Sequence, residues 1–138
     1  MSEETTETPS SKTENSKPAM FWTGWIITGL LSALFTFSAS AKIFGLGGEE
    51  AAKGLEKSGL PADQMIGLGI VELLCVVIYI IPRTSVLGAI LLAGYMGGAI
   101  CTHWRIGEPY WFQFLIGVLV WLGIYLREPR LRKILPLR

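Results

Sequence analysis

The sequence predicts an all-α membrane protein, a four-transmembrane-helix up-down bundle with a short surface helix between spans one and two. Of the 138 residues, 51% are hydrophobic and only 17% are charged, whereas soluble domains carry about 25% charged residues. The charges are crowded into residues 1–18, one central loop and residues 127–138. Four apolar segments lie between these stretches, so we expect one transmembrane domain, residues 19–126, and no separate soluble domain.

The two ends of the chain differ from this domain in composition. Residues 1–18 are rich in Ser, Thr and Glu and have no apolar period, which predicts a disordered N-terminal tail. Residues 127–138 predict a basic cytoplasmic tail, because positively charged segments flanking membrane spans stay in the cytoplasm.

The predicted spans are residues 19–44, 65–81, 84–102 and 110–126, of which the second and fourth are close to the lower limit of about 17 residues. Aromatic side chains lie at the segment ends, as expected for an interfacial belt: Trp22, Trp25, Trp104, Tyr110, Trp111 and Tyr125. The first segment ends in Ala39-Ser40-Ala41, which also resembles the cleavage site of a secretory signal peptide. Its length and the acidic segment before it favour a retained span.

The Lys and Arg residues indicate the orientation of the bundle. An even number of spans puts both termini on one side, which then holds Lys12, Lys17, Arg83, Arg127, Arg130, Arg132, Lys133 and Arg138. The other side holds Lys42, Lys53, Lys57 and Arg105. We therefore expect an integral multi-pass protein of a bacterial inner membrane with both termini cytoplasmic.

The loop at residues 45–63 has two interpretations. It contains good helix formers and Glu-to-Lys pairs three and four residues apart, preceded by Gly47-Gly48 and followed by Gly59-Leu60-Pro61. This pattern predicts a short helix on the outer surface. A solvated connector without regular structure is the alternative.

Small residues recur on the first and third spans and predict helix-packing faces, since they let helices approach closely in lipid. The packing residues are Gly24, Thr28, Ser32, Thr36, Ser40, Gly94 and Gly98. We favour packing over a pore lining. The two strips can pack on each other or support a homodimer, and the sequence does not choose between these arrangements.

The two cysteines, Cys75 and Cys101, lie inside apolar segments. At about 1.5 Å per residue they differ in membrane depth by more than a disulfide can span. We therefore interpret both as inert buried thiols, and no Cys or His spacing in the chain indicates a metal site.

Glu72 is the most informative residue, because it is a carboxylate within an otherwise uncharged apolar run. A charge at the centre of a bilayer costs about 2.5–3.5 kcal/mol, so Glu72 predicts a partner, a ligand or a transferred proton. Given the expected orientation, polar side chains at membrane depth gather in the outer half: Lys42, Glu72, Thr102, His103 and Gln113. We interpret this group as the lining of a polar cavity that binds a ligand.

Each member of the group also has a simpler interpretation. Lys42 alone can be a snorkelling anchor, and His103 can be ordinary interfacial polarity. Gln113 suits an interhelical hydrogen bond, and Glu72 can be tied to hydroxyl groups of the first span. Because Glu72 lies about 10–13 Å below the outer interface at 1.5 Å per residue, direct contact with Lys42 requires tilting or an intervening water. Whether Glu72 contacts Lys42 or His103 stays open.

The chemistry of a Glu, a Lys and a His around a small cavity suits proton exchange with a quinone-like carbonyl, or binding of a small anion. The sequence contains no nucleophile–base pair, phosphate loop or haem motif, so catalysis by this chain alone has little support. We expect no covalently bound cofactor. The net charge of +1 gives no argument for nucleic acid.

The chain contains several short motifs and single residues that are informative together: Ala41-Lys42-Ile43-Phe44, Gly59-Leu60-Pro61, Gly69-Ile70-Val71-Glu72-Leu73, Pro82, Gly88-Ala89, Tyr95-Met96-Gly97-Gly98-Ala99 and His103. Over residues 21–126 the chain resembles the DoxX-like family of four-helix membrane proteins. The resemblance implies an up-down bundle. DoxX itself is known as a subunit of a thiosulfate:quinone oxidoreductase, and most DoxX-like proteins have no assigned activity. Ser38 and Ala39 replace a glycine that relatives often have, which makes a close approach of the first span less assured.

Three functions remain as alternatives. The first is an accessory redox subunit that binds a quinone in the cavity and associates with a membrane or peripheral oxidoreductase subunit. The second is a small proton-coupled transporter, although four-helix multidrug-resistance transporters carry their membrane Glu on the first span. The third is a non-catalytic structural or assembly protein in the lipid bilayer.

Overall fold

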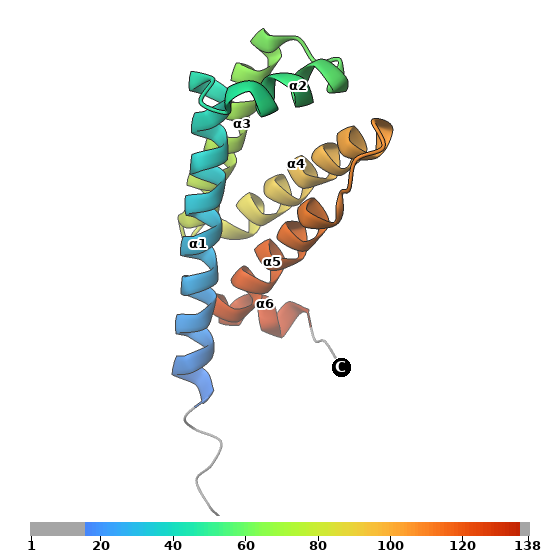
Figure 1. Ribbon diagram of the computed structural model, residues 1–138. Coiled ribbons are helices and arrows are strands. Elements are labelled where there is room, and N and C mark those ends of the chain that lie inside the picture. Colours follow the sequence, from blue (N-terminus) through green and yellow to red (C-terminus); the bar gives the residue numbers. More distant parts are fainter. Residues whose placement is uncertain (1–15, 136–138) are drawn as a thin grey trace, which may run out of the picture.

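The computed structural model describes residues 16–135, which form six α-helices and no strand (Figure 1). The helices are α1 (Ser16–Phe44), α2 (Gly48–Ser58), α3 (Ala62–Ile80), α4 (Ser85–Arg105), α5 (Trp111–Arg127) and α6 (Pro129–Ile134). The all-α fold class and the short surface helix between the first two spans are confirmed. Most of the predicted N-terminal tail lies outside the described residues, but its residues 16–18 already belong to α1.

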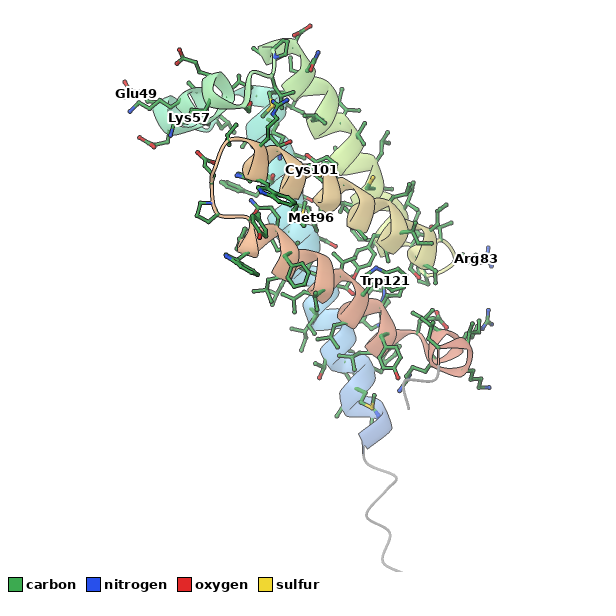
Figure 2. The ribbon with its side chains drawn as sticks, turned by 90° about the vertical axis from the view of Figure 1, so that its right-hand side faces the viewer. Glu49, Lys57, Arg83, Met96, Cys101 and Trp121 are labelled. Atoms are coloured by element: carbon green, nitrogen blue, oxygen red, sulfur yellow. The ribbon has the colours of Figure 1, made fainter. Side chains whose placement is uncertain are left out.

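The four long helices form an up-down bundle in which each packs against two neighbours. α1 and α4 lie diagonally opposite each other, and both pack against α3 and α5. Figure 1 shows α4 and α5 running obliquely away from α1 and α3 toward the end that carries α2, which we call the α2 end. The opposite end contains the α3–α4 turn, where Figure 2 labels Arg83.

The interior is filled by apolar side chains away from the α2 end. Val76, Tyr79, Leu92, Val120 and Ile124 are all buried. The Tyr79 hydroxyl donates to the Val120 carbonyl over 2.9 Å, which satisfies its polar atom within the core. α3 and α4 touch backbone to backbone here, because a Cβ atom at Gly88 would lie 2.3 Å from the Cα atom of Tyr79.

The outer surface of the bundle is apolar. α1, α3 and α4 are long and apolar enough to cross a membrane, and α5 is a shorter apolar helix. Large hydrophobic side chains point away from the bundle on all four helices, for example Leu30, Phe37, Leu74, Ile90 and Phe114. Such a continuous exposed apolar surface is expected only where lipid covers it. The protein is therefore a multi-pass integral membrane protein.

The strip of small residues on α1 packs over only part of its length. A Cβ atom at Gly24 would lie 2.6 Å from the backbone nitrogen of Arg127 on α5. Thr28 and Ser32 are buried. Thr36 is exposed and Ser40 is half-buried. A spacing of four residues drifts by about 40° per step around a helix of 3.6 residues per turn, so the strip leaves the packed face.

The Gly94 and Gly98 pair on α4 does not pack against any of the other helices that the structure describes. Both glycines are exposed, and neither would bring a Cβ atom within 4 Å of a neighbouring group. The possibility that the strips of α1 and α4 pack on each other is therefore wrong. These helices occupy opposite corners of the bundle.

Arg127 is part of the bundle and not of the basic tail in which the sequence placed it. Its side chain is buried, and the guanidinium carbon lies 4.7 Å and 4.9 Å from the ring centroids of Trp25 and Tyr79. It also donates to the Tyr79 carbonyl. Cation–π contacts of this kind stabilise a cation that is shielded from water. The next residues form α6, whose first turn is capped by Glu128 through the Arg130 amide.

Both cysteines are free, and they differ in burial. Cys75 is buried in the core, whereas Cys101 is exposed on the surface of α4. The prediction that both thiols are buried is therefore wrong for Cys101. An apolar span has a face toward lipid, and hydrophobicity alone does not tell that face from the core.

Candidate functional site

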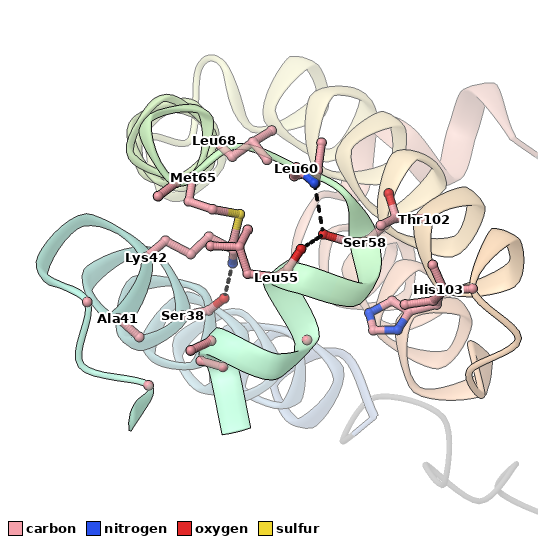
Figure 3. Close-up of a pocket in the computed structure, with 18 of the residues that line it drawn as sticks. Ser38, Ala41, Lys42, Leu55, Ser58, Leu60, Met65, Leu68, Thr102 and His103 are labelled. Atoms are coloured by element: carbon pink, nitrogen blue, oxygen red, sulfur yellow. Dashed lines mark hydrogen bonds between the residues drawn. The ribbon is translucent and has the colours of Figure 1, made fainter. Parts of the chain in front are cut away.

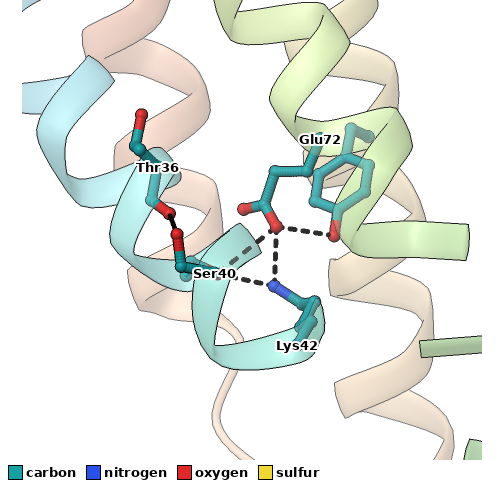
Figure 4. Close-up of polar contacts among 6 residues, drawn as sticks. Thr36, Ser40, Lys42 and Glu72 are labelled. Carbon is teal, nitrogen blue, oxygen red and sulfur yellow. Dashed lines mark hydrogen bonds and ion pairs between the residues drawn. The ribbon is translucent and has the colours of Figure 1, made fainter. Parts of the chain in front are cut away.

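The centre of the site is an ion pair between α1 and α3. The Lys42 ammonium lies 2.8 Å from Oε2 of Glu72, whose side chain is 1% exposed, and it also donates to the Ser38 hydroxyl (Figure 4). Ser38 in turn donates to the same carboxylate oxygen over 3.4 Å. The buried carboxylate thus has both a counter-charge and hydrogen-bond donors, which a charge at this depth requires.

The contact is direct, without an intervening water, and it answers the open question of whether Glu72 contacts Lys42 or His103. Gly69, one turn before Glu72, allows α3 to press against α1. A Cβ atom there would lie 2.9 Å from the Ala39 carbonyl and 3.2 Å from the Lys42 Cβ atom. The helices are close enough for the flexible lysine stem to reach down to Glu72. The glycine that enables this contact lies on α3, so Ser38 and Ala39 of α1 do not prevent it.

Tyr95 of α4 is the third partner of Glu72, and it was not among the predicted site residues. Its hydroxyl donates to Oε2 over 3.2 Å, and its ring centroid lies 5.9 Å from the Lys42 nitrogen. The sequence did indicate a contact at Tyr95, because a tyrosine within an apolar span needs a partner for its hydroxyl group. The partner itself is set by the packing of α4 against α3.

A large cavity opens beside this centre at the α2 end. It has a volume of about 850 Å³, and Figure 3 shows α2 lying across it. Most of its lining is apolar, including Leu55, Leu60, Met65, Leu68 and Ala99. The polar lining residues are Ser38, Lys42, Ser58, Tyr95, Thr102, His103 and Glu108. The cavity exists because α4 and α5 diverge from α1 and α3 at this end, and side chains of α2 cover the gap.

Two polar contacts hold the C-terminal end of helix α2 against the rest of the protein. Arg105 donates to the Ser58 carbonyl, and Lys57 lies 3.8 Å from Glu108. Figure 2 shows Lys57 at the α2 end of the molecule. Gly48 and Gly59 bound the helix with φ angles of 62° and 68°, which favour glycine at these turns. α2 therefore covers the cavity and is held by the turns at its two ends and by these polar contacts at its C-terminal end.

A second, smaller cavity of about 250 Å³ lies against the ion pair. It shares Ser38, Lys42, Tyr95, Ala99 and His103 with the large cavity, and its other walls include Glu72 and Gln113. The structure thus brings Lys42, Glu72, His103 and Gln113 around one space. Thr102 lines only the large cavity, and its hydroxyl donates to the Gly98 carbonyl over 3.0 Å.

His103 does not contact Glu72. Its Nδ1 atom lies 3.1 Å from Oε2 of Glu108, a residue that the sequence analysis did not single out. Glu108 follows His103 by five residues in the loop after α4, where Gly107 has a φ angle of 73°. This turn folds the carboxylate back onto the imidazole. Glu108 also faces Lys57, so it connects α2 with the rim of the cavity.

These features define a small polytopic membrane protein of four spans with a polar centre beneath an apolar cavity. The chain matches the model of the DoxX-like family over residues 26–125 and belongs to this family. The matched range contains the ion pair, Tyr95, His103 and Gln113. Comparison with curated proteins and with solved structures found no match.

Proposed function

We propose that this DoxX-like protein is an accessory membrane subunit that binds a quinone or its reduced form at the α2 end. The main observation in support is the cavity of about 850 Å³. Most of its lining is apolar, and a few polar side chains converge at one place. Ligand sites in proteins have this character and span about 300–1,000 Å³. The ring of a quinone suits the apolar walls, and its oxygen atoms suit the polar groups.

The packed interior below Glu72 favours a binding site over a transport path. Val76, Tyr79 and Val120 are each at most 2% exposed, so the cavity ends at the ion pair. Lys42 also compensates the charge of Glu72 directly. A proton-coupled transporter needs its carboxylate to face both sides in turn. Substrate flux into liposomes under a pH gradient would contradict the accessory role.

The cavity can be filled without disturbing the fold, which gives a direct test. Gly98 and Gly94 lie one turn apart on α4, and a Cβ atom at either position meets nothing within 4 Å. Only Gly98 lines the cavity. We expect Gly98→Leu to weaken binding of a short-tailed benzoquinone about tenfold or more, which corresponds to ~1.4 kcal/mol. Gly94→Leu is the matched control and should bind as the wild type does.

Isothermal titration calorimetry of the purified protein in lipid nanodiscs measures both dissociation constants. Equal binding by the wild type and both variants would mean that the quinone binds elsewhere. If the wild type binds no quinone, the structural or assembly function becomes the better account. In that case Glu72→Gln should change only the stability of the protein.

A further inference from the structure

The small cavity differs from the large one in the hydrogen-bonding groups that its walls leave unpaired. Around Glu72, three side chains direct their hydrogen bonds to the same oxygen: Lys42, Ser38 and Tyr95 all donate to Oε2. Among the described residues no side chain donates to Oε1 of Glu72. This second oxygen remains an acceptor, since a carboxylate has two oxygens with about four lone-pair sites.

Two hydroxyl groups of the centre have already used their donor hydrogens. The hydrogen of Tyr95 is directed to Glu72, and the hydrogen of Ser38 is directed to the same atom. A hydroxyl group has one donor hydrogen and two lone pairs. Toward a ligand, the Tyr95 hydroxyl therefore acts as an acceptor.

Gln113 contributes an acceptor that has no hydrogen-bond partner among residues 16–135. Its Oε1 atom is buried and makes no hydrogen bond, and the residue lines the small cavity beside Glu72. An unpaired buried carbonyl is unfavourable, because it has lost its hydrogen bonds to water. A ligand that donates to this atom would remove that cost.

His103 also lines the small cavity. Its Nδ1 atom faces Oε2 of Glu108, and an ionised carboxylate can only accept. The imidazole therefore carries a hydrogen on Nδ1, whereas Nε2 is an acceptor in the neutral ring and a donor in the protonated ring, so His103 is not counted among the acceptors. Three acceptors thus line the space: Glu72 Oε1, Tyr95 Oη and Gln113 Oε1. The donors left to balance them are the third hydrogen of the Lys42 ammonium and the Gln113 amide nitrogen.

We propose that the small cavity binds a head group that carries hydroxyl donors, so that of a quinone couple the reduced hydroquinone is the preferred ligand. A hydroquinone has two O–H donors, whereas the oxidised quinone has only carbonyl acceptors. A quinone carbonyl can accept from Lys42 or Gln113, but it leaves the acceptors of the small cavity unpaired, and this mismatch favours the hydroquinone over the quinone. This inference rests on the proposed function and specifies the redox form that the site takes.

The test compares the two redox forms on the full chain. Under anaerobic conditions, the wild-type protein in nanodiscs is titrated with a short-tailed benzoquinone and, separately, with its hydroquinone. We expect the hydroquinone to bind about tenfold more tightly, the effect of one additional well-formed hydrogen bond. Gln113→Leu should reduce this preference, mainly by weakening hydroquinone binding.

Gln64→Leu is the matched control, since Gln64 is exposed in the first turn of α3 and lines neither cavity. It should retain the full preference. Gln113→Leu should fold normally, because it replaces an unpaired acceptor by an apolar group of similar size, and thermal unfolding checks this.

The outcomes separate the two proposals. Equal affinities for both forms, or tighter binding of the quinone, overturn the hydroxyl-donor inference and leave the proposed function standing. A Gln113→Leu protein that keeps the full preference also overturns it. If neither form binds to the wild type, the proposed function fails, and this inference fails with it.

Discussion

At the scale of single residues, Glu72 is held in the bundle by a centre that satisfies its Oε2 atom, while its Oε1 atom has no side-chain donor among residues 16–135. Lys42 supplies the counter-charge, and Ser38 and Tyr95 supply further donors. Removing one member of a buried ion pair is more costly than removing both, because the remaining charge stays without compensation. The pair therefore has a structural role whatever ligand lies beside it.

Variants at the ion pair should therefore differ in stability. Lys42→Met should lower the free energy of unfolding by about 3–5 kcal/mol, and adding Glu72→Gln to it should restore most of the loss. Thermal unfolding in one detergent compares the proteins. Lys53→Met is the control, since Lys53 and Glu50 form an exposed pair 3.4 Å apart and should contribute little. A Lys42→Met protein as stable as the control would show that Glu72 needs no counter-charge.

The residues of the site were predictable only in part. Glu72 and Lys42 stand out because charges are rare in apolar spans. Tyr95 and Ser38 are common residue types in such spans, and only the packing of α1, α3 and α4 makes them partners of Glu72. The contact between Lys42 and Glu72 could not be derived from rise per residue, because helix separation at Gly69 decides it.

At the scale of helices, the positions of the spans follow from the lengths of the apolar runs, and each predicted end lies within three residues of the observed one. The tilt angles of the spans do not follow from the apolar runs of the sequence. In lipid, apolar side chains are equally well placed toward a neighbouring helix or toward acyl chains, so hydrophobicity does not encode the packed face. The divergence of α4 and α5 at the α2 end, which forms the cavity, was therefore not predictable.

The close approach of α1 and α3 can be tested on α3 itself. Gly69→Ala places a methyl group against the Ala39 carbonyl and the Lys42 side chain, and we expect a loss of about 1–3 kcal/mol in stability. Gly67→Ala, with nothing within 4 Å, should be neutral or slightly stabilising, because alanine favours the helix. Thermal unfolding compares the two. Equal stability would mean that the helices separate without cost.

At the scale of the whole molecule, the distribution of basic residues predicts that the α2 end faces away from the cytoplasm. In a protein with both cysteines replaced by alanine, Glu49→Cys on α2 should react with a membrane-impermeant maleimide added to intact cells. Arg130→Cys on α6 should react only after the cells are opened. The reverse pattern would place the cavity on the cytoplasmic side.

The central claim is that the cavity beneath α2 binds a molecule of the quinone couple. Photolabelling with a short-tailed azidoquinone, followed by mass spectrometry of the labelled peptides, tests it most directly. The claim predicts labels on cavity-lining residues such as Leu55 and Ala99, which Gly98→Leu abolishes and Gly94→Leu leaves unchanged. Labels confined to the lipid-facing surface, or unaffected by Gly98→Leu, would contradict it.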